Sequence, residues 1–291
     1  MKLCILGPKE RTETEIQFLE NAKKYFDKVL YVPMSNMRIE SKNGQSIPYY
    51  KDTNLLGFDV ILPRITRKYS DAGYVLVKLF EDNAKYIPVK YSSIVFGYNE
   101  FLTPIYLSEH GIPMPHTYFA LSRVALDRIL PTLKYPALLK LPYEKRGRMI
   151  IDSESSAKGI IDTIQQFGQP IIIQEMIENS IGLSILVVSD KMYALKNKDK
   201  VYRLNEKDRE VVSNVVRVLG TSICQINALK TSSGLMILGV DICPNIVGFS
   251  EKFNEDMTEV ILKHLKERTE MHGEKNIVTR FLKWIDLGMP K

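Results

Sequence analysis

The chain has 291 residues, 45% of them hydrophobic and 25% charged, which is the composition of a globular protein and excludes a disordered one. Its apolar runs are too short to span a bilayer, and its first residues lack the apolar core of a signal peptide, so we expect a cytoplasmic protein with no membrane contact. Three scattered cysteines and four histidines argue against a zinc site. The net charge of +6 suits a ligand that carries phosphate, an acidic protein or nucleic acid.

Strand and helix patterns alternate over the N-terminal part of the chain. The expected elements are strands at residues 2–6, 28–33 and 59–63 and helices at 14–26 and 74–83. The Gly7-Pro8 pair ends the first of these strands. Because such alternation is typical of a parallel sheet with helical crossovers, we expect an N-terminal α/β subdomain over residues 1–92.

Two further α+β subdomains are expected, a central one over residues 93–175 and a C-terminal one over 176–291. The central part is predicted to contain helices at 99–110, 124–130 and 155–167 and strands at 113–115, 136–141, 149–152 and 170–175. The C-terminal part is predicted to contain strands at 184–188, 192–195, 224–229 and 235–241 and helices at 206–219 and 253–268. Gly111 and Gly220 follow two of the helices, where glycine commonly ends a helix.

Several segments, in this order and spacing, resemble the RimK-like branch of the ATP-grasp superfamily over about residues 1–265. This branch includes the ribosomal-protein glutamate ligase and the LysX enzymes. The matching segments are Pro63-Arg64-Ile65, the helix that leads to Gly111-Ile112-Pro113, the strand at 136–141, Gln174-Glu175-Met176-Ile177, and the run 226–248. The resemblance implies an α/β (α+β) ATP-grasp fold, in which an N-terminal parallel sheet precedes two α+β subdomains that enclose a nucleotide cleft.

The resemblance also implies the residues that bind ATP. It implies that Lys140, at the end of a strand, contacts the nucleotide phosphates, which suits a mobile point charge. The alternative for Lys140 is a solvated charge at the strand end. The adenine cleft and the ribose site are implied to be lined by Gln174, Glu175, Met176, Ile177 and Glu178.

The predicted phosphate loop departs from the family pattern. The family loop is rich in glycine because backbone N–H groups must approach the phosphates closely, whereas residues 142–148 keep only Gly147. Lys145, Arg146 and Arg148 either replace that cradle with side-chain charge or belong to a solvated loop. We count Arg146 among the candidate nucleotide-binding residues.

The metal site departs from the pattern as well. The family's Mg²⁺ ligands, an Asp, a Glu and an Asn, are matched here by Asn227, Gly239 and Asp241. Gly239 has no side-chain oxygen, so a two-metal clamp is hard to build, whereas Asp241 with Asn227 remains a candidate for one Mg²⁺. The family arginine that steadies the acyl-phosphate is replaced by Leu186.

Two hypotheses follow from this mixture of kept and lost residues. In the first, the protein is an ATP-dependent carboxylate–amine ligase that acts through an acyl-phosphate on a small-molecule or protein-tail acceptor. In the second, it is a catalytically degenerate relative that binds a nucleotide, a protein or nucleic acid. The basic segment at 196–203 leaves nucleic acid open, and a solvated hairpin tip is the alternative explanation of that segment.

Overall fold

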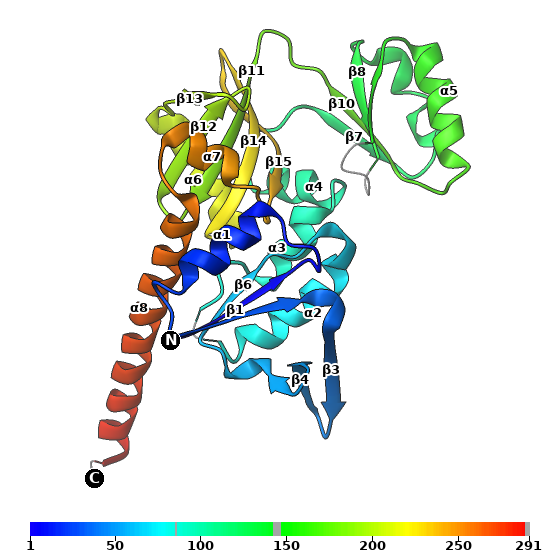
Figure 1. The fold of residues 1–291 in the computed structure, drawn as a ribbon. Coiled ribbons are helices and arrows are strands. Elements are labelled where there is room, and N and C mark those ends of the chain that lie inside the picture. Colours follow the sequence, from blue (N-terminus) through cyan, green and yellow to red (C-terminus); the bar gives the residue numbers. More distant parts are fainter. Residues whose placement is uncertain (85, 142–146, 289–291) are drawn as a thin grey trace.

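The computed structural model describes residues 1–84, 86–141 and 147–288, with residues 273–288 as backbone alone. Figure 1 shows three groups of elements: a parallel sheet near the N-terminus, a larger antiparallel sheet above it, and a smaller antiparallel sheet that stands to one side. These groups correspond to the architecture expected from the sequence. The predicted division at residues 92 and 175 stays a prediction.

The N-terminal sheet has the predicted parallel arrangement. Strand β1 (Lys2–Gly7) lies between β2 (Lys28–Pro33) and β6 (Val60–Pro63) and pairs in parallel with both. Helix α1 (Glu13–Ala22) connects β1 to β2, and α2 (Ser70–Glu81) follows β6. The expected helix at 14–26 therefore exists but ends earlier.

A hairpin that the sequence analysis missed projects from this sheet. It consists of β3 (Met37–Lys42) and β4 (Gln45–Tyr50), with a short β5 (Thr53–Asn54) beside β4. The turn residues Asn43 and Gly44 both have positive φ angles, of 52° and 76°. An Asn-Gly pair is the common solution for a two-residue hairpin turn, so the signal was present in the sequence.

Two helices connect this unit to the smaller sheet. They are α3 (Tyr91–Tyr98), which the sequence analysis also missed, and α4 (Leu102–Glu109), which lies within the predicted helix at 99–110. Gly111 follows α4 with a φ of +72°, as expected for a glycine that ends a helix.

The smaller sheet is antiparallel, with the order β7-β10-β8-β9. Its strands are β7 (Thr117–Ala120), β8 (Ala137–Lys140), β9 (Arg148–Ile151) and β10 (Ile171–Glu175), and α5 (Glu154–Gln165) accompanies them. The strand predicted at 113–115 was wrong, since the strand begins at Thr117. The helix predicted at 124–130 was also wrong: this segment forms two 3-10 turns, Val124–Leu126 and Leu130–Thr132, and Pro131, which has no backbone N–H to donate, lies in the second of them.

The larger sheet is antiparallel, with the order β13-β12-β11-β14-β15. Its strands are β11 (Ile181–Val188), β12 (Lys191–Lys196), β13 (Lys200–Tyr202), β14 (Ile223–Thr231) and β15 (Gly234–Asp241), and α6 (Glu206–Leu219) precedes β14. The predicted helix at 253–268 is in fact α7 (Val247–Phe253) followed by α8 (Met257–Gly288). Asn254, with a φ of +49°, ends α7, and the Asp256 side chain accepts hydrogen bonds from the first turn of α8.

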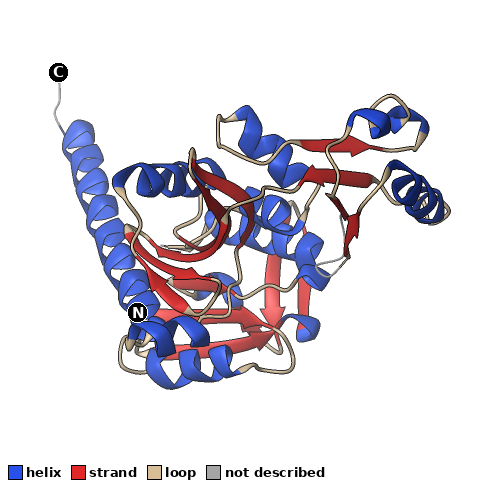
Figure 2. Ribbon diagram, turned by 90° about the horizontal axis from the view of Figure 1, so that it is seen from above, coloured by secondary structure: helices blue, strands red, loops and turns tan. Residues whose placement is uncertain are grey.

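The hydrophobic cores divide the molecule into two parts. Leu3 of β1, Leu186 of β11 and Leu262 of α8 belong to one buried cluster, so the N-terminal and larger sheets are packed together. The smaller sheet has a core of its own, which includes Leu139 and Ile161. We call residues 117–175 the lobe and the other described residues the body. Figure 2 shows the lobe and α8 on opposite sides of the body.

Among the described residues, none of the helices has both the length and the apolar character needed to cross a membrane.

Candidate functional site

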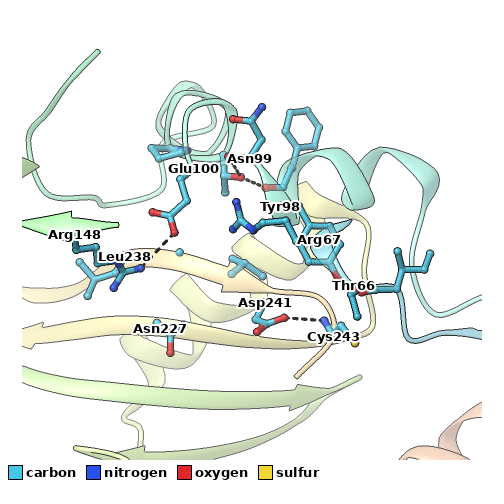
Figure 3. A pocket seen from close by; sticks show the side chains of 17 residues that line it. Thr66, Arg67, Tyr98, Asn99, Glu100, Arg148, Asn227, Leu238, Asp241 and Cys243 are labelled. Carbon is cyan, nitrogen blue, oxygen red and sulfur yellow. Dashed lines mark hydrogen bonds and ion pairs between the residues drawn. The ribbon is translucent and has the colours of Figure 1, made fainter. Parts of the chain in front are cut away.

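A cavity of about 330 Å³ lies where the lobe meets the body, and we call it the first cavity (Figure 3). Its walls come from the segment after β6, from the corner between α3 and α4, from the β14–β15 pair and from β9 of the lobe. Among the described residues, its charged lining side chains are Arg67, Glu100, Arg148 and Asp241. The cavity therefore collects charges from segments that are far apart in the sequence.

The β14–β15 pair brings the matched metal positions together. Asn227 pairs directly with Gly239, and Asp241 pairs with Gln225 near the end of β15. The side-chain oxygen of Asn227 accepts hydrogen bonds from Gln225 (2.9 Å) and Ser184 (3.4 Å). Asp241 accepts one from the backbone N–H of Cys243 (3.0 Å), which fixes the turn after β15. All three positions line the first cavity.

The donor set at this position tests whether Mg²⁺ fits. Two Mg²⁺ ions need a bridging carboxylate and near-octahedral oxygen coordination. Gly239 supplies no side-chain donor, and within the described ranges no group of three His, Cys, Asp or Glu side chains is arranged to hold a metal ion. The residues present therefore do not fit a two-ion clamp. A single ion on Asp241 and Asn227 stays a prediction.

Lys140, at the end of β8, is not among the described residues that line the first cavity, but it lies beside Arg148 and Glu100, which do. Its side chain is only 5% exposed, and its Nζ lies 3.9 Å from Oε2 of Glu100. Burial lowers the pKa of Lys140 to about 8; the Glu100 carboxylate opposes this shift and the Arg148 charge adds to it. Lys140 is thus a buried, paired cation rather than the solvated strand-end charge that the sequence left open.

Glu100 bridges the lobe and the body. Its Oε1 lies 3.4 Å from Nη2 of Arg148, and Arg148 is the β9 residue that pairs with Lys140 of β8. The Asn99 side chain accepts hydrogen bonds from the backbone N–H groups of Phe101 and Leu102, which begins α4 and holds Glu100 at its start. One carboxylate of the body therefore contacts two cations of the lobe.

The residues predicted to bind the nucleoside lie at the end of β10 and after it. Gln174 is buried and donates a hydrogen bond to the Thr117 hydroxyl (2.9 Å), so its side chain is engaged within the lobe sheet. Glu175 lies 3.4 Å from His116, and Met176 and Glu178 are exposed. Together with Ile177, these residues are not among those that line the first cavity in the described part of the chain.

A second hollow of about 560 Å³ adjoins these residues. It is lined by His116 and Thr117, which are the partners of Glu175 and Gln174, and Pro104 lines both this hollow and the first cavity. Gln174 and Glu175 thus contact residues that line the second hollow, and Lys140 contacts Glu100, which lines the first cavity. Of the remaining candidates, Arg146 lies outside the described residues.

Sequence reasoning did not identify Glu100 and Arg67 as site residues. Figure 3 shows both side chains directed into the first cavity, with Arg67 between Glu100 and Asp241 in this view. An acidic residue before a helix is common because it complements the helix dipole, so Glu100 gives no distinctive sequence signal. Its partners Lys140 and Arg148 are too distant in the sequence for spacing alone to connect them.

Comparison with known proteins agrees with this architecture. Residues 99–265 match the RimK-like ATP-grasp domain. A probable alpha-L-glutamate ligase of Hydrogenovibrio crunogenus is 23% identical to this chain. The alignment is 297 residues long and covers 94% of this chain and 98% of that protein.

Solved structures give the same result for the fold. A RimK-domain ATP-grasp protein of Sphaerobacter thermophilus superposes with a TM-score of 0.72 at 15% identity and covers 90% of this chain and 99% of its own. The ATP-grasp ligase PsnB, solved with a precursor peptide and AMPPNP, gives a TM-score of 0.73 at 10% identity over 92% of this chain and 97% of its own. Since the domain match also covers more than half of the chain, the protein belongs to the RimK-like ATP-grasp family.

Proposed function

We propose that the protein is an ATP-dependent ligase that joins a carboxylate to an amine. In this reaction the carboxylate attacks the γ-phosphate of ATP, which forms an acyl-phosphate and releases ADP. The amine then attacks the acyl carbon and phosphate leaves. Family membership supports the reaction class, and the glutamate ligase name carried by the Hydrogenovibrio crunogenus relative makes L-glutamate the first substrate to test, as the carboxylate or as the amine.

One observation carries the proposal. The matched metal positions Asn227 and Asp241 come from the larger sheet and Lys140 comes from the lobe, yet all three lie at or beside one cavity. Sequence matches in separate segments have no reason to converge in space unless they serve one site. A nucleotide site between the two sheets accounts for the convergence.

The proposed roles follow from this arrangement. Lys140 contacts the phosphates in the first cavity, and the segment from Gln174 to Glu178 contacts the nucleoside beside the second hollow. Mg²⁺, if one ion is used, lies on Asp241 and Asn227. The acceptor is an amine on a small molecule or a protein tail, a class supported by the precursor peptide in the structure of PsnB.

The test is release of ADP from ATP by the purified protein with L-glutamate and with a panel of other carboxylates and amines. We expect turnover that is lost in both Lys140→Ala and Asp241→Ala. Lys158→Ala is the matched control, because Lys158 forms an exposed ion pair with Glu154 on α5 and lines neither cavity. Unchanged turnover in both site variants would sink the site assignment.

Failure of every substrate pair would overturn the ligase proposal itself. The replacement of both carboxylates of the family's metal site, by Asn227 and Gly239, motivates that outcome, because the usual activation needs metal-bound charge next to the γ-phosphate. ATP binding without any turnover would then identify the protein as a catalytically degenerate relative that works by binding.

A further inference from the structure

The charges around the first cavity differ between its two sides. Among the described lining residues, the β14–β15 side carries one carboxylate, that of Asp241, because Gly239 has no side chain and Asn227 is neutral. The lobe side presents Arg148 in the cavity, with Lys140 paired to it across β8 and β9. Positive charge in the cavity therefore comes from Arg148 on the lobe side and from Arg67 after β6, whereas a pair of bound metal ions would need more than the single carboxylate described on the β14–β15 side.

Arg148 is suited to bind a phosphate group. It is half-exposed, it lines the first cavity, and its guanidinium group already contacts a carboxylate oxygen at 3.4 Å. Guanidinium groups pair with phosphate and carboxylate oxygens in the same two-pronged geometry and stay charged at all physiological pH values. A ligand oxygen at the position of the Glu100 carboxylate would meet the same two cations.

Glu100 is held there only loosely. Its ion-pair distances to described residues, 3.9 Å to Lys140 and 3.4 Å to Arg148, are long, although its side chain is only 18% exposed. A nucleotide di- or triphosphate carries more negative charge and more oxygen acceptors than one carboxylate. Such a group can therefore compete with Glu100 for both cations.

We propose that Arg148 binds nucleotide phosphates together with Lys140, that these side chains supply the positive charge otherwise brought by Mg²⁺, and that Glu100 occupies their site until the phosphates displace it. The ligand is a nucleoside di- or triphosphate free of metal. This inference rests on the proposed nucleotide site and goes beyond it, because it assigns Arg148 and Glu100 roles and makes binding independent of a divalent cation.

The experiment is calorimetric titration of the full chain with ATP, once in excess EDTA and once with Mg²⁺. We expect wild-type affinities that agree within about threefold, since on this proposal the cavity gains little from the metal. Arg148→Gln should weaken binding at least about tenfold, because charge-assisted bonds to phosphate are lost. Arg123→Gln is the matched control, since Arg123 is also a lobe arginine in an ion pair, with Asp162, and should leave affinity unchanged.

Glu100→Gln gives an effect of the opposite sign and so cannot be confused with loss of folding. Removing the competing carboxylate should tighten ATP binding by about three- to tenfold, with the largest effect at low salt. Weaker binding by this variant would refute the role of Glu100. Equal affinities for Arg148→Gln and Arg123→Gln, or a wild-type affinity that Mg²⁺ raises more than tenfold, would refute the role of Arg148.

The outcomes separate this inference from the ligase proposal. If ATP binds through Arg148 without a metal but no ADP is released, the phosphate-binding role of Arg148 is supported and the ligase proposal is refuted. If turnover requires Mg²⁺ and is unaffected by Arg148→Gln, the ligase proposal is supported and the phosphate-binding role of Arg148 is refuted. Absence of ATP binding under both conditions overturns both.

Discussion

Two ion clusters of the molecule differ in their contact distances and in their access to a cavity. Arg64, just after β6, lies 3.0 Å from Glu15 of α1, and both side chains are at most 7% exposed. The second oxygen of Glu15 accepts a hydrogen bond from the backbone N–H of Thr12, at 3.0 Å. The Glu100 cluster has longer contacts and borders an open cavity.

The difference in contacts and exposure indicates whether a ligand can replace the carboxylate in each cluster. In the Arg64–Glu15 pair, the carboxylate is used by the capping box of α1 as well as by the arginine, so no ligand can replace it without damage to the helix. In the Glu100 cluster, the carboxylate lies beside two lobe cations at the edge of the first cavity, where an anion from solution can replace it as their partner. The first cluster is expected to govern stability and the second to govern binding.

The largest effect is expected from Glu15→Gln. It leaves the Arg64 charge buried and unpaired, and should lower the free energy of unfolding by about 3–5 kcal/mol. Urea unfolding with an unchanged m-value measures this. Changing both residues, Glu15→Gln with Arg64→Met, should cost less than Glu15→Gln alone; an equal or larger cost would contradict the assignment of a structural pair.

The same pair predicts a pH dependence. Burial raises the pKa of Glu15, but the Arg64 charge and the hydrogen bonds from Thr12 and Arg64 outweigh it, so the folded-state pKa is below the ordinary value of 4.5. The contribution to stability is therefore complete above that value and is lost as the pH falls below it. Unfolding measured from pH 6 downward should show a smaller pH dependence in Glu15→Gln than in the wild type.

The second effect is expected from Lys140→Met, and it should separate binding from stability. Loss of a buried cation should weaken ATP binding by about 100-fold, because charged hydrogen bonds to phosphate disappear. Stability should stay equal or rise, since the desolvation of the lysine is removed. A large loss of stability in this variant, resembling that of Glu15→Gln, would show that the two clusters do not differ in kind.

The third effect is the pH dependence of ATP binding. The pKa of Lys140 is lowered to about 8 by burial, so the side chain loses its charge as the pH rises through that value, and affinity should fall by at most about tenfold per pH unit. The free protein should become more stable between about pH 8 and 10.5, because there the unfolded chain binds the proton and the folded chain does not. Titrations at pH 7, 8 and 9 should show this fall in the wild type and none in Lys140→Met.

The sequence predicted most of the regular elements because their signals are local. The helix at 206–219 has the predicted bounds, since the Asn205 side chain accepts the N–H of Asp208 and Gly220 takes the left-handed conformation that ends the helix. Helix α3 was missed because it is short and its two serines, Ser92 and Ser93, are adjacent, so its polar and apolar residues are only weakly separated onto two faces. The site was less accessible to such reasoning: Lys140 and Asp241 were found by resemblance, whereas Glu100 acquires its role only when folding brings β8 and β9 to it.

The smallest effect calibrates the other three. Arg123 and Asp162 form an ion pair on the lobe with a shorter distance, 3.1 Å, than either contact of Glu100, but their side chains are 34% and 55% exposed. Water and salt screen such a pair, so Asp162→Asn should change the free energy of unfolding by no more than about 0.5 kcal/mol and leave ATP affinity unchanged. The Arg123–Asp162 contact is shorter than those of Glu100, yet its predicted effect on stability and ATP affinity is smaller. The pair therefore tests whether burial and access to the cavity, rather than the contact distance, decide the effect of each cluster. Urea unfolding measures this change. If Asp162→Asn lowered the free energy of unfolding by more than about 2 kcal/mol, contact distance would matter more than burial, and the difference between the Glu15 and Glu100 clusters would need another cause.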